Sequence, residues 1–195
     1  MKWNETMKEP IKTKKSAKNK KEDVQKKATK DIFWDYVPYI IIIIFVIIIR
    51  TYIATPIRVN GNSMDPTLSE GETMILNKIG LKKGIKRFDI IVVNAGSDYI
   101  IKRVIAMPGE TIAYIDGKLY INGKYMEDKY SLSKTEDFDV VKLQDNEYFV
   151  MGDNRAISKD SRIIGPVTEN QIKGKTNLVI FPFSKMGIVK KWIPI

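Results

Sequence analysis

The composition of this 195-residue chain excludes several classes of protein before any motif is considered. The chain has no cysteine, which rules out a disulfide framework, thiolate catalysis and cysteine-type zinc sites. It has no histidine, which rules out a Ser-His-Asp triad. A carboxylate site for magnesium or calcium stays open as an alternative, but no acidic loop has EF-hand spacing, and we expect neither a metal nor a cofactor. An apolar fraction of 44% is enough for one domain with appendages.

The net charge of +10 is concentrated at the N-terminus. Residues 1–30 contain eleven lysines and four acidic residues, a net charge of +7, which leaves only +3 for the rest of the chain. This tail has few apolar residues to offset the entropy of ordering it, so we expect residues 1–35 to be disordered. Trp3 is its one aromatic residue within the first thirty, and we therefore expect no binding of nucleic acid.

An isoleucine-rich stretch predicts a membrane anchor. Residues 36–49 carry no charge but are too few for a bilayer, which takes about 20 residues of helix. Extension through Arg50 to Ala54 gives 19 residues, and Arg50 near one end can reach the headgroups. We predict a transmembrane helix over 36–54, with the lysine-rich end in the cytoplasm and residues 55–195 outside. Aromatic residues typical of the membrane interface stand at its edges, namely Phe33, Trp34, Tyr36, Tyr39 and Tyr52.

A cleavable signal peptide is the alternative interpretation of this stretch. It would have a short basic region and a small-x-small cleavage site. Here the basic region is about thirty residues long, and Tyr52 stands two places before Ala54. We therefore favour an uncleaved anchor.

After the anchor the sequence predicts a mostly antiparallel β domain, because short β-prone runs alternate with turn signals and no long 3.6-residue period occurs. Asp116-Gly117 predicts a two-residue hairpin and Pro108-Gly109 a type II turn. Residues 128–146 are polar and irregular, and we expect an insertion or a mobile loop there. The expected strands are Thr73–Leu76, Asp89–Val93, Tyr99–Ile105, Thr111–Ile115, Lys118–Ile121, Glu147–Met151 and Asn177–Phe181.

Ser63 is the candidate nucleophile. It follows Gly61 and precedes Asp65-Pro66, a pattern that favours a sharp bend. Such a bend exposes a hydroxyl and leaves backbone N–H groups free to bind an oxyanion. Taken alone, the pattern also fits an ordinary turn serine.

Lys102 is the candidate base, since a lysine is the known substitute where a serine has no histidine. It stands beside Arg103 in a run of large aliphatic residues. Successive residues of a strand face opposite sides, so one of the two cations can face solvent while the other turns inward. Burial would lower the lysine pKa from about 10.4 and increase the neutral fraction. A surface lysine on an edge strand is the alternative.

A third block, from Gly152 to Arg162, offers supporting groups. Ser158 can hydrogen-bond a neutral lysine amine. Asp160 and Arg162 are two residues apart, so on an extended segment they can share a face and form an ion pair. The block also fits a polar loop held by local side-chain hydrogen bonds.

Together the three blocks resemble the bacterial type I signal peptidases, the Ser-Lys serine proteases, in their Gram-positive form. The motifs are Gly-x-Ser-Met-x-Pro-Thr-Leu, Lys-Arg-Val-x-x-x-Pro-Gly and Gly-Asp-Asn-Arg-x-x-Ser-x-Asp-Ser-Arg, and the resemblance covers residues 36–183. It implies a signal-peptidase-like β fold, with Ser63 as nucleophile and Lys102 as general base. The supporting residues that it implies are Ser158, which orients the lysine, the structural pair Asp160 and Arg162, and Asp153.

The resemblance also implies shallow apolar S1 and S3 pockets that admit small side chains, and hence cleavage after Ala-x-Ala. Two positions depart from the family pattern. Gly61 stands where some members have a hydroxyl that helps to bind the oxyanion, and Glu110 stands where the family usually has Asp. The positions that match the pockets are Ile57, Val59, Met64, Leu68 and Ile101.

The predicted function is a membrane-anchored endopeptidase that removes signal peptides from exported preproteins. The expected location is the plasma membrane, crossed once. The expected partners are signal-peptide-bearing preproteins and the lipid bilayer, with the export translocon as a further candidate. Two alternatives stay open, namely a related Ser-Lys protease for a dedicated or self substrate, and a catalytically silent homologue that binds substrates.

Overall fold

The computed structural model describes residues 33–189 apart from 80, 82–83 and 132, so most of the predicted tail lies outside the described residues. A helix over Phe33–Ile53 is long and apolar enough to cross a membrane. Its last five residues form the π-helical segment η1 (Ile49–Ile53). Residues 33–35, which we assigned to the tail, are therefore helical, and Ala54, which we assigned to the anchor, belongs to the first strand.

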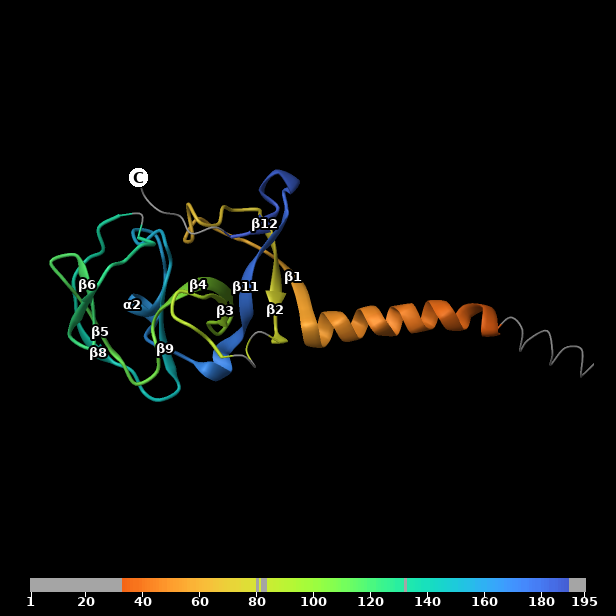
Figure 1. The fold of residues 1–195 in the computed structure, drawn as a ribbon, viewed down its shortest axis with the longest axis horizontal. Coiled ribbons are helices and arrows are strands. Elements are labelled where there is room, and N and C mark those ends of the chain that lie inside the picture. The colour runs from red at the N-terminus through yellow and green to blue at the C-terminus, as the bar shows by residue number, and fades with distance from the viewer. Residues whose placement is uncertain (1–32, 80, 82–83, 132, 190–195) are drawn as a thin grey trace, which may run out of the picture. The chain divides into compact units, whose positions relative to one another are not determined.

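The chain divides into two compact units, and the second, which begins at Ile49, contains two β-sheets (Figure 1). The larger has the strand order β1-β2-β11-β3-β4-β9-β10, with β12 on β11, and the smaller has the order β7-β6-β5-β8. All the strand pairs that the structure describes are antiparallel, which confirms the predicted class.

The larger sheet contains β1 (Ala54–Arg58), β2 (Thr73–Asn77), β3 (Ile90–Asn94), β4 (Tyr99–Ala106), β9 (Glu147–Met151), β10 (Val167–Thr168), β11 (Ile172–Phe181) and β12 (Gly187–Ile188). The smaller contains β5 (Thr111–Ile115), β6 (Lys118–Ile121), β7 (Lys124–Met126) and β8 (Phe138–Lys142). Short helices described after β9 are α2 (Ser161–Ile164), η3 (Glu169–Gln171) and η4 (Phe183–Lys185).

The predicted turns form as the sequence indicated. Asp116 and Gly117 have φ of 52° and 70°, the two positive values of a type I′ hairpin between β5 and β6. Gly109 has φ of 76°, and the N–H of Glu110 donates to the carbonyl of Met107 at 3.2 Å. A positive φ at the third residue and this hydrogen bond are the features of the predicted type II turn.

The expectation of an insertion or mobile loop at 128–146 is wrong for residues 138–142, which form a strand, while the described residues of 128–137 form neither helix nor strand. β8 (Phe138–Lys142) pairs with β5, and Tyr130 and Leu143 are buried. Polar residues dilute the apolar pattern here, because β8 is an edge strand whose Val140 remains exposed. Strand β11 also begins five residues earlier than predicted, at Ile172, because its lysines and Gly174 hide the apolar alternation.

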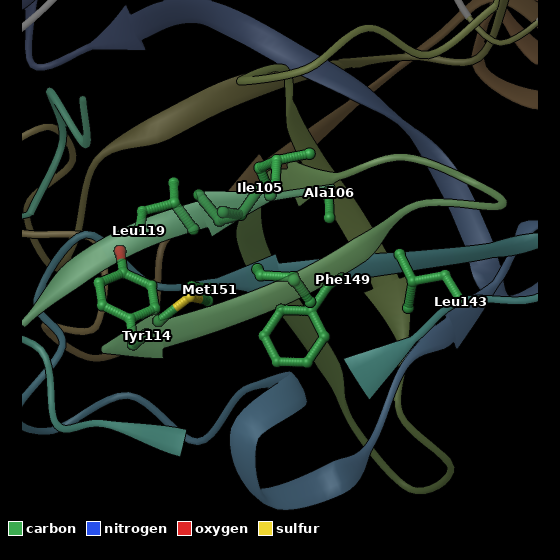
Figure 2. Packing of buried hydrophobic residues seen from close by; sticks show 9 residues of the cluster. Ile105, Ala106, Tyr114, Leu119, Leu143, Phe149 and Met151 are labelled. Atoms are coloured by element: carbon green, nitrogen blue, oxygen red, sulfur yellow. The ribbon is translucent and has the colours of Figure 1, made fainter. Parts of the chain in front are cut away.

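A core cluster packs the two sheets together (Figure 2). Ile105 and Ala106 of β4 and Phe149 and Met151 of β9 belong to the larger sheet, and Tyr114 of β5 to the smaller. Figure 2 shows these side chains converging on one another, and all of them are essentially inaccessible to solvent. Because β4 and β9 contribute to this cluster, the strand that carries Lys102 has a rigid support.

Candidate active site

The turn that follows β1 presents the Ser63 hydroxyl to Lys102. Gly61 has φ of 81°, a conformation that glycine adopts without a steric penalty. Beyond it, the N–H of Leu68 donates to the Met64 carbonyl at 3.0 Å and so closes the turn after the serine. The Lys102 Nζ lies 2.6 Å from the Ser63 Oγ and donates a hydrogen bond to it. The structure therefore brings the two predicted catalytic residues, 39 positions apart in the chain, into direct contact.

The Lys102 amine lies in a place that favours its neutral form. Lys102 is 3% exposed and lies in β4 opposite Ile91 of β3. Desolvation lowers the pKa of Lys102 from 10.5 to about 8, against the opposing influence of the Asp160 and Asp153 carboxylates. At a pKa of about 8, roughly a tenth of the amine is free base at pH 7. A neutral amine can accept a proton from the serine hydroxyl that it contacts.

Arg103 is buried as deeply as Lys102, at 3% exposed, so neither member of the Lys-Arg pair faces solvent as one of them was expected to do. The reason is an internal counter-ion. Arg103 donates from Nε and Nη2 to the two carboxylate oxygens of Asp153, at 2.8 and 2.6 Å. Its Nη1 donates to the Phe88 carbonyl at 2.9 Å, and its guanidinium carbon lies 3.7 Å from the centre of the Tyr130 ring. Sequence spacing does not reveal this pairing.

Asp153 also connects this ion pair to the nucleophile turn. The Thr67 hydroxyl donates to Asp153 Oδ2. The N–H of Asn154, the next residue, donates to the Ser63 carbonyl at 3.1 Å. The turn after β9 is thus attached on one side to β4, through Arg103, and on the other to the turn that carries Ser63.

The predicted ion pair between Asp160 and Arg162 forms, with a distance of 2.9 Å between Nε and Oδ1. Its setting differs from the expectation, because Asp160 is not followed by an extended segment but is the N-cap of α2. Burial by itself raises the pKa of Asp160, but hydrogen bonds from Arg162, Gly152 and Ser158 outweigh it and hold that pKa below its usual value.

Ser158 contacts the same carboxylate instead of the lysine amine. Its Oγ accepts from the N–H of Gly152 at 3.1 Å, and its hydroxyl contributes to the low pKa of Asp160. Within the described part of the chain, the Lys102 Nζ donates its hydrogen bond to the Ser63 Oγ. Gly152 is confined by these contacts, since a Cβ there would lie 2.3 Å from both the Ser158 Oγ and the Ser63 carbonyl oxygen.

A cleft of about 260 Å³ contains Ser63 and Lys102, and its lining includes Val59, Met64 and Ile101 of the predicted pockets. A neighbouring hollow of about 630 Å³ is lined by Ile57 and again by Ile101. Leu68 is fully buried in the core cluster beneath, together with Val59 and Met64. Four of the five predicted pocket residues thus line the two cavities, and the fifth, Leu68, packs in the same core cluster as Val59 and Met64.

A second buried charge cluster was not anticipated from the sequence. Arg155 donates to the Gly152 carbonyl through Nε at 2.7 Å and forms an ion pair with Asp128. The same Asp128 accepts from the Tyr114 hydroxyl. The cluster joins the turn after β9 to β5 and to residues 128–135. Among the described residues, no group of three or more His, Cys, Asp or Glu side chains is placed to hold a metal ion.

Comparison with known proteins places the chain in a family. The family model described as signal peptidase, peptidase S26, matches residues 33–181. Signal peptidase I of Bacillus amyloliquefaciens is 36% identical over 184 residues, which cover 87% of this chain and 100% of the relative. Signal peptidase I S of Bacillus subtilis (strain 168) is 38% identical over 181 residues, 86% of this chain and 97% of the relative.

Two further similar proteins are a signal peptidase of Staphylococcus aureus and a solved structure. Signal peptidase IB of Staphylococcus aureus (strain N315) is 36% identical over 163 residues, 73% of this chain and 85% of the relative. A crystal structure of a signal peptidase I from Enterococcus faecalis V583 has 35% identity and a TM-score of 0.43, with 47% of this chain and 95% of that chain covered. From the family match and the length of these alignments, the chain belongs to the Gram-positive type I signal peptidases, peptidase family S26, which are serine endopeptidases that cleave signal peptides from preproteins.

Proposed function

We propose that this protein is a membrane-anchored Ser-Lys endopeptidase that removes signal peptides after small residues of the Ala-x-Ala type. The observation that carries the proposal is the 2.6 Å hydrogen bond between the Nζ of the buried Lys102 and the Ser63 Oγ in the cleft. The low pKa of Lys102 supports it, because a base for serine must be neutral when the hydroxyl attacks.

The reaction follows from this pair of groups. Neutral Lys102 takes the proton of Ser63 while the Oγ attacks the carbonyl carbon of the scissile bond. The resulting oxyanion is stabilised by the Ser63 N–H, because Gly61 offers no side-chain donor. The lysine ammonium then gives its proton to the leaving amine, and the bond to the mature protein breaks. In the second half, Lys102 deprotonates a water that hydrolyses the acyl-enzyme.

The supporting residues act through position. Ser158 and Asp160 both accept from the N–H of Gly152, at 3.1 and 3.0 Å, and so fix the turn that packs behind Ser63. Arg162 neutralises Asp160. This pairing limits how far the carboxylate favours the charged form of Lys102, whose pKa Asp160 would otherwise raise further.

The substrate has two strand edges available to it. Among the described strands, β1 pairs with β2 alone, and the first residues of β4, Tyr99–Lys102, pair with β3 alone, because the pairing with β9 begins at Arg103. An extended peptide can add hydrogen bonds at such an edge. In this arrangement Val59, Met64 and Ile101 limit the side chain at −1, and Ile57 and Ile101 limit the side chain at −3.

The membrane anchor raises the rate on substrates in the same bilayer. The helix over Phe33–Ile53 is the anchor, with residues 1–32 in the cytoplasm because positive residues favour that side. The protease domain after residue 54 then lies outside the plasma membrane, where preproteins emerge from the export translocon. Tethering enzyme and substrate to one membrane increases their effective concentration.

The test is cleavage of a model preprotein by the detergent-solubilised full chain. We expect a single cut after Ala-x-Ala, identified by sequencing the new N-terminus, and no cut by Ser63→Ala. A cut elsewhere, or equal cutting by Ser63→Ala, would contradict the proposal. Stable binding of the preprotein without any cut would favour the catalytically silent homologue.

A further inference from the structure

The loop after β9 supplies one wall of the Ser63 cleft. Ile157 and Lys159 line this cleft together with the nucleophile turn and the start of β4. The loop is attached to the nucleophile, because the Asn154 N–H donates to the Ser63 carbonyl at 3.1 Å and the Ile157 N–H donates to the Asn154 carbonyl at 3.4 Å. Ile157 is therefore held close to the bond that is cut.

This wall belongs to one of the two cavities only. The neighbouring larger hollow shares Arg58, Tyr99 and Ile101 with the Ser63 cleft, but neither Ile157 nor Lys159 lines it. In the proposed function the residues before the scissile bond run along β1 and β4 toward that hollow. The residues after the bond must leave the Ser63 cleft by its remaining side, where the loop stands.

We propose that Ile157 and Lys159 form the binding wall for the first two residues of the mature protein, and that Ile157 selects an apolar side chain there. The proposal rests on the proposed function. Ile157 is 60% exposed, so an apolar substrate side chain can remove its surface from water. In a shallow apolar site, contacts of this size change kcat/KM by about tenfold.

Lys159 adds a charge preference at the same wall. It is exposed, and no acidic side chain of the described chain forms an ion pair with it. An acidic residue in the substrate is therefore favoured over a basic one by a factor of a few. Since both charges are in contact with solvent, this preference decreases as salt is added.

The experiment uses the full-length protein in detergent and a model preprotein with Ala at −1 and −3. Position +1 and then position +2 are changed to Leu or Ser, and kcat/KM is measured for each. We expect Leu to exceed Ser by about tenfold at one of the two positions. Ile157→Ser should reduce this ratio to near one. The matched control is Ile163→Ser, which changes an isoleucine that is 70% exposed but lies outside the cleft lining.

The control variant should keep the wild-type ratio, and thermal melting should show that both variants are folded. Lys159→Gln should remove the preference for Glu over Lys at the same position, together with its dependence on salt. Equal ratios in Ile157→Ser and wild type, or no preference in the wild type, would overturn the inference while cleavage after Ala continues. Failure of the wild type to cut any of the substrates would overturn both this inference and the proposed function.

Discussion

Two adjacent basic residues of β4 are equally buried, and yet only one of them is placed to lose a proton. Arg103 has a dedicated counter-ion in Asp153, to which it donates hydrogen bonds through two nitrogens. Lys102 has a serine hydroxyl as its partner, at 2.6 Å, and desolvation lowers its pKa to about 8. Burial alone therefore does not make a base. Among the described residues no carboxylate forms an ion pair with Lys102, and this leaves the lysine free to lose its proton.

The largest effect is expected on activity when Lys102 is changed. Lys102→Arg should reduce cleavage below about 0.1% of wild type, because a guanidinium does not release its proton and general-base catalysis contributes about 10²–10⁴-fold. Lys102→Met should be equally inactive. The measurement is single-turnover cleavage of a preprotein, and real activity in Lys102→Arg would remove the lysine from its role as base.

The same substitution should leave the fold at least as stable. Lys102→Met removes an amine whose charged form is penalised in the folded state and keeps most of the apolar stem. Well below pH 8 that penalty is fully present, and the lowering of the Lys102 pKa from 10.5 to about 8 corresponds to about 3 kcal/mol. Urea unfolding at pH 7 should give Lys102→Met a free energy of unfolding equal to or above that of wild type, and a value well below it would contradict the buried-base assignment.

Removal of the counter-ion of Arg103 should lower the free energy of unfolding, because this buried cation depends on Asp153. Asp153→Asn leaves a buried guanidinium without a charge partner, which costs about 3–5 kcal/mol. The matched control is Asp89→Asn, which breaks a more exposed ion pair to Lys175. A pair of that kind contributes about 0–1 kcal/mol. Equal losses of unfolding free energy in the two variants would mean that the Arg103 pair has no special role.

Both activity and stability should depend on pH through the pKa of Lys102. Activity requires neutral Lys102, so kcat/KM should rise along a limb with its midpoint at about 8. Stability should change at a higher pH. Between a folded pKa of about 8 and an unfolded value of 10.5, the unfolded chain binds more protons, so the contribution of Lys102 to the free energy of unfolding increases with pH. Lys102→Met should lack this contribution, and a flat activity profile between pH 6.5 and 9.5 would contradict the mechanism.

The hairpins could be predicted from the sequence, because they depend on local residue types. The pairing of Ser63 with Lys102 came from the resemblance of the three motifs to a known family, since each residue taken alone also fits an ordinary turn serine or a surface lysine. The Asp116-Gly117 turn needs two residues that tolerate positive φ, and the bend before Ser63 contains Gly61 with φ of 81°. The partners of Arg103 could not be found in this way. Asp153 is 50 positions away and Tyr130 lies in a polar segment without periodicity, so only the folded arrangement brings them together. Ser158 shows the same limit, since its motif position was evident but its partners are Gly152 and Asp160.

The smallest expected effect concerns the ring above Arg103. Tyr130 is 4% exposed and packs with its ring 3.7 Å from the guanidinium carbon, so it keeps water away from the Arg103–Asp153 pair. A cation–π contact of this kind depends on the ring and not on the hydroxyl. Tyr130→Phe should therefore remain close to wild type in urea unfolding, while Tyr130→Leu should lose about 1–2 kcal/mol. Cleavage should follow the same order, because a looser Arg103–Asp153 pair loosens the turn attached to Ser63. If Leu and Phe give the same stability, the ring acts only by filling space, and the distinction between the two cations lies in Asp153 alone.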